Sequence, residues 1–150
     1  MNIILLSGGS GKRLWPLSND IRSKQFIKLF KDDNGNYESM VQRVYRQITT
    51  VNPMVKVTVA TSKNQVSVIK SQLGEKINIC VEPSRRDTFP AILLAAAYIH
   101  YELGIGVEEC IAVCPVDPYV DNDYYKCVGE LENLVEAGTA NLTLMGIKPT

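Results

Sequence analysis

The chain has 150 residues, of which 45% are hydrophobic and 21% charged, and this balance predicts a single compact domain with its own buried core. Its 16 basic and 16 acidic side chains cancel, which argues against broad binding to nucleic acid or to anionic membranes. No apolar run reaches the roughly 18 residues of a membrane span, and the N-terminus lacks the basic region of a secretory signal, so we expect a cytoplasmic protein.

Short runs of branched apolar residues predict five strands. These are Asn2–Leu6, Val55–Ala60, Ile77–Val81, Cys110–Cys114 and Leu142–Ile147. The runs are continuous rather than alternating, which is typical of parallel strands covered on both faces.

Segments with helical spacing alternate with these strands, and most have end signals. They are Met40–Ile48, Val66–Leu73 behind a capping box at Ser62–Gln65, Ala91–Leu103 beside the cap Thr88 and the first-turn proline Pro90, and Asp123–Ala137 between the N-cap Asp121 and Gly138. The alternation predicts right-handed βαβ units and an α/β fold that is Rossmann-like and doubly wound, with a mostly parallel sheet and helices on both faces. Because the chain stops just after a predicted strand, we expect residues 1–150 to be a fragment of a longer protein.

The cysteines do not suggest a metal site. Cys80, Cys110, Cys114 and Cys127 contain no CxxC pair, and the sequence has a single histidine, His100. Two cysteines at the ends of one strand would lie about 13 Å apart, too far to share an ion. We therefore expect buried, reduced core thiols.

The loop after the first predicted strand reads SGGSGKRLWPLS and is the first place to seek a ligand, because ligands of open α/β sheets gather at the carboxyl ends of the strands. Its glycines allow backbone N–H groups to approach a ligand closely, and Lys12 and Arg13 add charge suited to a polyphosphate. Residues 1–31 hold six basic side chains and one acidic one. The alternative is a flexible surface turn with solvated charges.

Two common phosphate motifs do not fit this loop. A P-loop requires glycine where the chain has Leu6 and serine or threonine where it has Arg13. A dinucleotide fingerprint requires glycine at Leu14 and an uninterrupted helix where Pro16 stands.

Four blocks in chain order resemble the sugar-phosphate nucleotidyltransferases. They are GGSGKRLWPLS, KQF at Lys24, EPSRRDT at 82–88, and the Pro-x-Asp at 115–117 that follows a buried strand. The tryptophan form of the loop, with KQF and the Glu-Pro block, is most similar to the bacterial mannose-1-phosphate guanylyltransferases. The resemblance runs along the whole chain, which it identifies as the N-terminal, nucleotide-binding part of such a domain.

The resemblance implies a role for each block. Arg13, Lys24 and Asp117 would be catalytic: Arg13 on the departing pyrophosphate, Lys24 on the α-phosphate or the sugar phosphate, and Asp117 on Mg²⁺. The nucleotide would be bound by Leu6, Ser7, Gly8, Gly9, Ser10, Gly11, Lys12, Arg13, Glu82, Arg86, Asp87 and Thr88.

Some positions depart from the family pattern or have a simpler explanation. The chain has Ser23 before its lysine where the family commonly has proline, Asp87 where it has asparagine, and Val116 and Pro118 around the metal aspartate where it has serine and histidine. Arg85 and Arg86 could be an ordinary solvated pair. Asp121 and Asp123 read as turn and cap residues, without EF-hand spacing.

The reaction implied is attack of mannose-1-phosphate on the α-phosphorus of GTP, giving GDP-mannose and pyrophosphate. Two alternatives stay open: a nucleotide-binding or regulatory module without turnover, and a transferase for another NTP or sugar phosphate. The expected partners are GTP and mannose-1-phosphate, a homodimer is compatible with the family, and we expect this fragment alone to be inactive.

Overall fold

A four-stranded parallel sheet is the centre of the fold. The computed structural model describes residues 1–9, 18 and 23–147. The sheet consists of β1 (Asn2–Leu6), β4 (Lys56–Ser62), β5 (Asn78–Glu82) and β6 (Ile111–Pro115), in the order β5-β4-β1-β6. Ile4 of β1 pairs with Thr58 on one side and Val113 on the other. Four of the five predicted strands and the parallel arrangement are confirmed.

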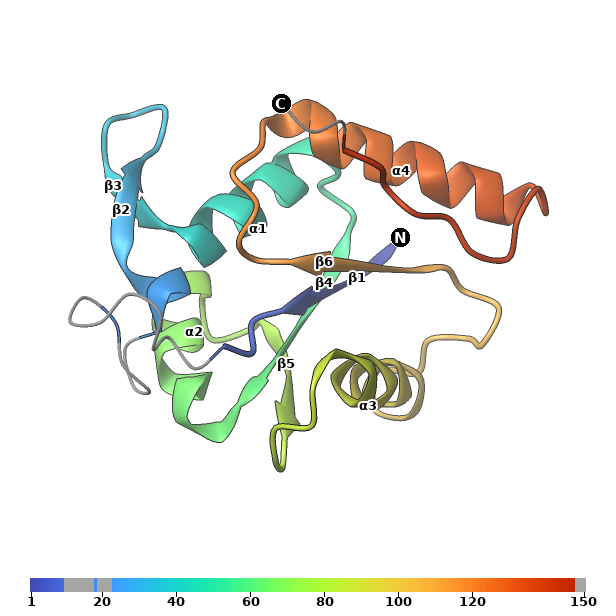
Figure 1. Ribbon diagram of the computed structural model, residues 1–150, viewed down its shortest axis with the longest axis horizontal. Coiled ribbons are helices and arrows are strands. Elements are labelled where there is room, and N and C mark those ends of the chain that lie inside the picture. The colour runs from blue at the N-terminus through green and yellow to red at the C-terminus, as the bar shows by residue number, and fades with distance from the viewer. Residues whose placement is uncertain (10–17, 19–22, 148–150) are drawn as a thin grey trace.

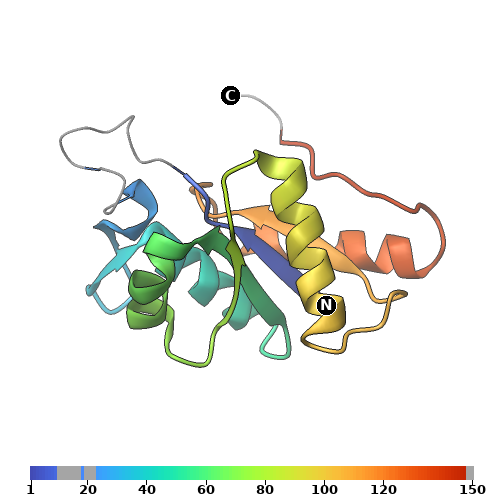
Figure 2. The ribbon, with the colours of Figure 1, turned by 90° about the horizontal axis from the view of Figure 1, so that it is seen from below.

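Helices cover both faces of the sheet, as the sequence predicts (Figures 1 and 2). One face packs against α1 (Met40–Val51), α2 (Val66–Leu73) and α4 (Asn122–Glu136), and the other against α3 (Thr88–Tyr101). Successive residues of β1 serve the two cores in turn: Ile3 and Leu5 join the first cluster, and Ile4 joins the α3 cluster. The continuous apolar run of β1 follows from this double burial.

The predicted helix ends are partly right. Asp121 caps α4 by accepting hydrogen bonds from the backbone amides of Asp123 and Tyr124, and Gly138 follows the helix at φ +69°. The capping box expected at Ser62–Gln65 is wrong, because Ser62 makes no side-chain cap bond there and a 3₁₀ turn, η3 (Lys63–Gln65), precedes α2. The capping box of the structure joins Ser39 to Gln42 at the start of α1.

The start of α3 also differs from the expectation. Thr88 is the first helical residue, and Asp87 occupies the N-cap position without a side-chain cap bond. Pro90 lies in the first turn, as expected, where its missing N–H costs nothing.

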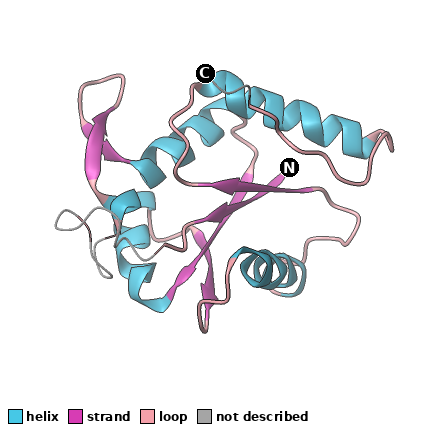
Figure 3. Ribbon diagram, in the orientation of Figure 1, coloured by secondary structure: helices cyan, strands magenta, loops and turns pink. Residues whose placement is uncertain are grey.

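A small antiparallel hairpin lies apart from the main sheet (Figure 3). It joins β2 (Lys28–Lys31) to β3 (Tyr37–Ser39) and follows a 3₁₀ turn, η2 (Lys24–Phe26). Its turn is closed by the Asp32 carboxylate, which accepts hydrogen bonds from the amides of Asn34 and Asn36. The sequence analysis missed this hairpin.

The strand predicted at Leu142–Ile147 is not formed. The segment has no regular secondary structure, and Leu142 and Leu144 are 76% and 83% exposed. A strand requires a partner for its ladder of hydrogen bonds, and this run pairs with none of the described strands. An apolar run alone therefore does not specify a strand.

The cysteines occupy different environments. Cys80 and Cys114 are buried, whereas Cys110 is half-buried and Cys127 is exposed, and all four are free thiols. The expectation of buried thiols is therefore wrong for Cys127 and only partly met by Cys110. No helix among the described residues has the length and apolarity to cross a membrane.

Candidate functional site

The loops that follow the parallel strands meet at one edge of the sheet. Because all four strands run in the same direction, their carboxyl ends lie together and the chain leaves them toward the same side. Gly8 and Gly9 follow β1, η3 follows β4, the segment 83–87 follows β5, and Asp117 follows β6. This is the edge at which open α/β sheets bind ligands.

The larger cavity at this edge has a volume of about 550 Å³. It is lined by Leu6, Ser7, Gly8, Gly9, Lys24, Gln25, Thr88, Ile92, Val113, Pro115, Val116 and Asp117. Seven residues that the sequence analysis assigned to nucleotide binding or catalysis thus meet around one space, although they come from four separate parts of the chain.

A second cavity of about 260 Å³ adjoins the first at Leu6, Gly8, Gly9 and Thr88. Its other lining residues are Glu82, Arg85, Asp87 and Ala91. Glu82 approaches the glycine loop closely, since a Cβ added at Gly8 would come within 3.2 Å of a Glu82 carboxylate oxygen. The glycine loop therefore separates two compartments, one beside the Glu-Pro block and one beside Lys24 and Asp117.

Lys24 and Asp117 form an ion pair at the larger cavity. The Lys24 Nζ lies 3.1 Å from Asp117 Oδ2, and the two side chains are 38% and 50% exposed. Lys24 comes from η2 and Asp117 from the loop after β6, so the pair joins two elements that are 93 residues apart in the sequence. Both charges remain accessible to a ligand.

The carbonyl groups of the glycine loop are held by side chains. Gln25 Nε2 donates to the Ser7 carbonyl oxygen at 2.7 Å, and Arg85 donates to the Gly9 carbonyl oxygen at 2.8 Å. Among the described residues, the Ser7 hydroxyl is buried without a hydrogen-bond partner beside the larger cavity. A buried polar group without a partner costs free energy, so this hydroxyl is a polar group of the loop that the described residues leave unsatisfied.

The remaining predicted residues are not all at the cavities. Arg86 is exposed, donates to the Ser84 hydroxyl at 3.3 Å and lines neither cavity. Ser10, Gly11, Lys12 and Arg13 lie outside the described residues. Arg85, Gln25 and Gln65 were missed; the first two stand inside blocks that the sequence analysis quoted, whereas Gln65 was interpreted as a helix cap.

The side chains at the site could hold a metal ion only together with a bound ligand that supplies further oxygen atoms. Within the described part of the chain, no group of three or more histidine, cysteine, aspartate or glutamate side chains could hold an ion. Asp117 offers one half-exposed carboxylate. Mg²⁺ commonly takes one or two carboxylates and completes its shell with substrate phosphates and water. A single accessible carboxylate beside a cavity of about 550 Å³ is compatible with that arrangement.

Comparison with known proteins establishes the family. A family model described as nucleotidyl transferase matches residues 2–149. The chain belongs to the nucleotidyl transferase family. A mannose-1-phosphate guanylyltransferase of Escherichia coli is 32% identical over 151 residues, covering 98% of this chain and 31% of that protein. The xanthan biosynthesis protein XanB of Xanthomonas campestris is 32% identical over 150 residues, covering 98% and 30%.

Solved structures agree on the fold. A crystal structure described as a mannose-1-phosphate geranyltransferase from Thermus thermophilus matches with a TM-score of 0.71 and 28% identity, over 91% of this chain and 38% of that one. A mannose-6-phosphate isomerase structure from Helicobacter pylori, at 20% identity and a TM-score of 0.62 over 91% of this chain and 47% of that one, supports the fold alone. This nucleotidyltransferase chain spans about 31% of the length of the Escherichia coli relative.

Proposed function

We propose that this chain binds the nucleoside triphosphate in a sugar-phosphate nucleotidyl transfer, with GTP and mannose-1-phosphate as substrates. The observation behind the proposal is the larger cavity, where the glycine loop faces the Lys24–Asp117 pair. The names of the relatives, among them mannose-1-phosphate guanylyltransferase, support the choice of substrates. The nucleoside would occupy the smaller cavity beside Glu82 and Asp87, and the phosphates the larger one.

The chemistry requires charge neutralisation rather than a base. An oxygen of the sugar phosphate attacks the α-phosphorus of GTP, a new P–O bond forms, and the bond to the β-phosphate oxygen breaks, so that pyrophosphate leaves with the electron pair. The attacking oxygen is already anionic, so no proton must be removed. Bringing two polyanions together is the main barrier, and fixed cations lower it.

The side chains divide this work. Lys24, 38% exposed at the larger cavity, would hold the α-phosphate or the incoming sugar phosphate. Arg13, outside the described residues, is proposed for the departing pyrophosphate. Asp117 would hold Mg²⁺ together with the phosphates, and the ion would neutralise charge on the phosphate oxygens.

Isothermal calorimetry and a pyrophosphate-release assay test this proposal. We expect the chain to bind GTP with Mg²⁺, and Lys24→Met to weaken binding by about tenfold, the scale of one lost charge-assisted contact. Lys70→Met is the matched control, because Lys70 is a surface lysine of α2 paired with Glu75 and lines none of the cavities at the site.

The assay outcomes separate the alternatives. Pyrophosphate release with GTP and mannose-1-phosphate supports the proposal in full. Release with another NTP or sugar phosphate assigns a different transferase. Binding without release is the result expected of this chain alone, whereas binding without release by the whole protein, in any pairing, would indicate a nucleotide-binding module. Absence of binding by every NTP tested would overturn the proposal.

A further inference from the structure

A buried chain of polar side chains lies beneath the glycine loop. Thr61, Gln65 and Ser23 are each 0% exposed. The Thr61 hydroxyl donates to Gln65 Oε1 at 2.7 Å, and Gln65 Nε2 donates to the Ser23 hydroxyl at 2.9 Å. Ser23 in turn donates to the Gly9 carbonyl oxygen at 3.1 Å. Three buried polar groups are thus satisfied by one another and by a backbone carbonyl of the loop.

The Gly9 carbonyl oxygen is the point where this network ends. Besides Ser23, it lies 3.4 Å from Gln65 Nε2 and accepts a hydrogen bond from Arg85 at 2.8 Å. Its donors come from the segments after β4 and β5 and from the start of η2. The loop after β1 is therefore anchored by the loops of two other strands of the sheet.

The anchoring determines which backbone groups of the loop remain available. The Ser7 amide donates to the Ala60 carbonyl, and the carbonyl oxygens of Ser7 and Gly9 accept from side chains. The amides of Gly8 and Gly9 have no hydrogen-bond partner among the described residues, and both glycines line the two cavities. Free amides beside a cavity are the groups that bind phosphate oxygens in glycine-rich loops.

Thr61 fixes the orientation of the Gln65 amide. Its hydroxyl supplies the hydrogen bond to Oε1, so the two N–H hydrogens of Gln65 are directed to Ser23 and Gly9. This explains why the capping motif at Ser62–Gln65 is not used: the Gln65 side chain is engaged with the glycine loop, and Gln65 stands at the N-cap of α2 without a side-chain cap bond. The Gln65 side chain therefore donates to Ser23 and to the Gly9 carbonyl oxygen and does not cap α2.

We propose that Gln65 is a positioning residue that holds the Gly9 carbonyl, and with it the free amides of the loop, for the phosphates of the nucleotide. Gln65 touches no ligand in this proposal, since it lines neither cavity. The inference rests on the proposed nucleotide binding, and its test separates the two.

The test replaces Gln65 with methionine, which keeps the length of the side chain and removes both hydrogen-bonding groups. We expect GTP affinity to fall about tenfold, because the contacts of Gln65 with Gly9 and Ser23 are lost, while affinity for guanosine changes by less than about twofold. Thr61→Val, which leaves the Gln65 amide free to rotate, should give a smaller fall in GTP affinity. Ile69→Val is the matched control, since Ile69 is 0% exposed on α2 and belongs to the apolar core.

A second measurement needs no nucleotide. The ¹³C resonance of the Gly9 carbonyl reports hydrogen bonding to its oxygen, and it should move in Gln65→Met and stay in place in Ile69→Val. If the wild-type chain binds no nucleotide, the proposed function fails and the carbonyl resonance still decides whether Gln65 holds the loop. If the variant binds GTP as the wild type does, or loses GTP and guanosine affinity equally, the positioning role is overturned.

Discussion

Replacing Asp117 with asparagine should change GTP binding in opposite directions with and without Mg²⁺. Asp117 follows β6 closely and pairs with Lys24 at the larger cavity at 3.1 Å. Its carboxylate repels phosphate oxygens unless a cation lies between them. Asparagine has nearly the same shape and removes only the charge.

The exposure of Lys24 and Asp117 limits the change in GTP affinity that is expected without metal. Both partners are well exposed, at 38% and 50%, so the ion pair itself contributes at most about 1 kcal/mol. Without metal, the loss of the carboxylate releases Lys24 for phosphate, and GTP affinity should rise by up to about fivefold. With Mg²⁺, a charge-assisted ligand contact is lost, and affinity should fall by about 10- to 100-fold.

Isothermal calorimetry of GTP in Mg²⁺ and in EDTA measures both effects on one protein. Asp121→Asn is the control, because Asp121 caps α4 and asparagine caps about as well as aspartate. An Asp117→Asn effect of the same sign and size in both buffers would refute the metal role and leave Asp117 as the structural partner of Lys24.

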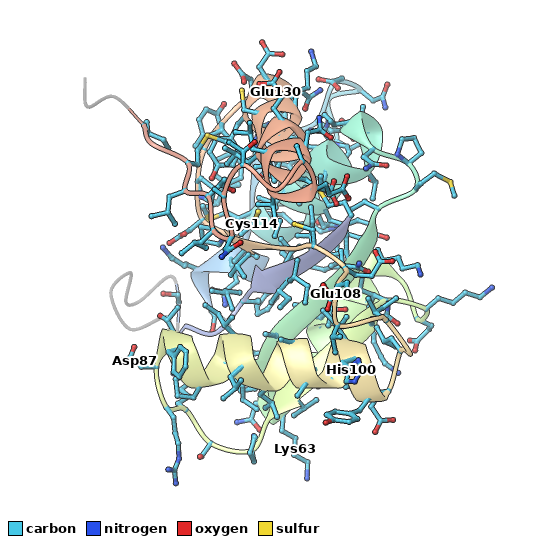
Figure 4. All side chains as sticks on the ribbon, turned by 90° about the vertical axis from the view of Figure 1, so that its right-hand side faces the viewer. Lys63, Asp87, His100, Glu108, Cys114 and Glu130 are labelled. Atoms are coloured by element: carbon cyan, nitrogen blue, oxygen red, sulfur yellow. The ribbon has the colours of Figure 1, made fainter. Side chains whose placement is uncertain are left out.

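The thiols offer two further predictions. Burial raises the pKa of Cys114, which lies on β6 beneath α4 (Figure 4), from 9.0 to about 11. The contribution of the protonated thiol to the free energy of unfolding is therefore fully present below pH 9 and is lost as the pH rises toward 11. Between pH 8 and pH 10.5 the wild type should lose about 2 kcal/mol more than Cys114→Ala in urea unfolding, and equal losses would contradict this. Cys127 is exposed, so maleimide at neutral pH should modify it first, ahead of buried Cys80 and Cys114, and Cys127→Ser should remove the fast phase.

The central strands are predictable because their signal is local. Each of Ile3, Ile4 and Leu5 in β1 is covered by one core or the other, so the burial of this strand on both faces is visible in the sequence as the apolar run Asn2–Leu6. The hairpin has no such run, since β2 (Lys28–Lys31) is mostly exposed; its signal was the Asn34-Gly35 turn. Leu142–Ile147 shows the opposite error, because strand pairing depends on a distant partner that composition does not reveal.

The difference between local signals and contacts with distant residues also decides which parts of the candidate site were predictable. The loops after β1 and β6 were predictable as neighbours, because parallel strands bring their carboxyl ends together. The choice between adjacent Arg85 and Arg86 was not, since only the path of the loop after β5 brings one of them to Gly9. Gln65 was interpreted as a cap because its true partners, Thr61 and Ser23, are assembled by the fold.

Asp87 is expected to lower the free energy of unfolding, because its backbone conformation at the site is strained. It precedes α3 (Figure 4), lines the smaller cavity and has φ +71° and ψ −172°, a backbone region that is almost restricted to glycine. Its side chain makes no cap bond that would compensate. Such strain costs about 1–3 kcal/mol, and the extra freedom of glycine in the unfolded chain returns about 0.5–1 kcal/mol of that.

Asp87→Gly should therefore raise the free energy of unfolding by about 1 kcal/mol, measured by urea denaturation. Asp87→Asn retains the β-carbon and should leave stability within about 0.5 kcal/mol of the wild type, which separates backbone strain from charge. If nucleoside affinity falls in the glycine variant while its free energy of unfolding rises, Asp87 contributes to binding. The strained backbone conformation would then be retained for function at a cost in stability. A glycine variant less stable than the wild type would show that the backbone at Asp87 is not strained.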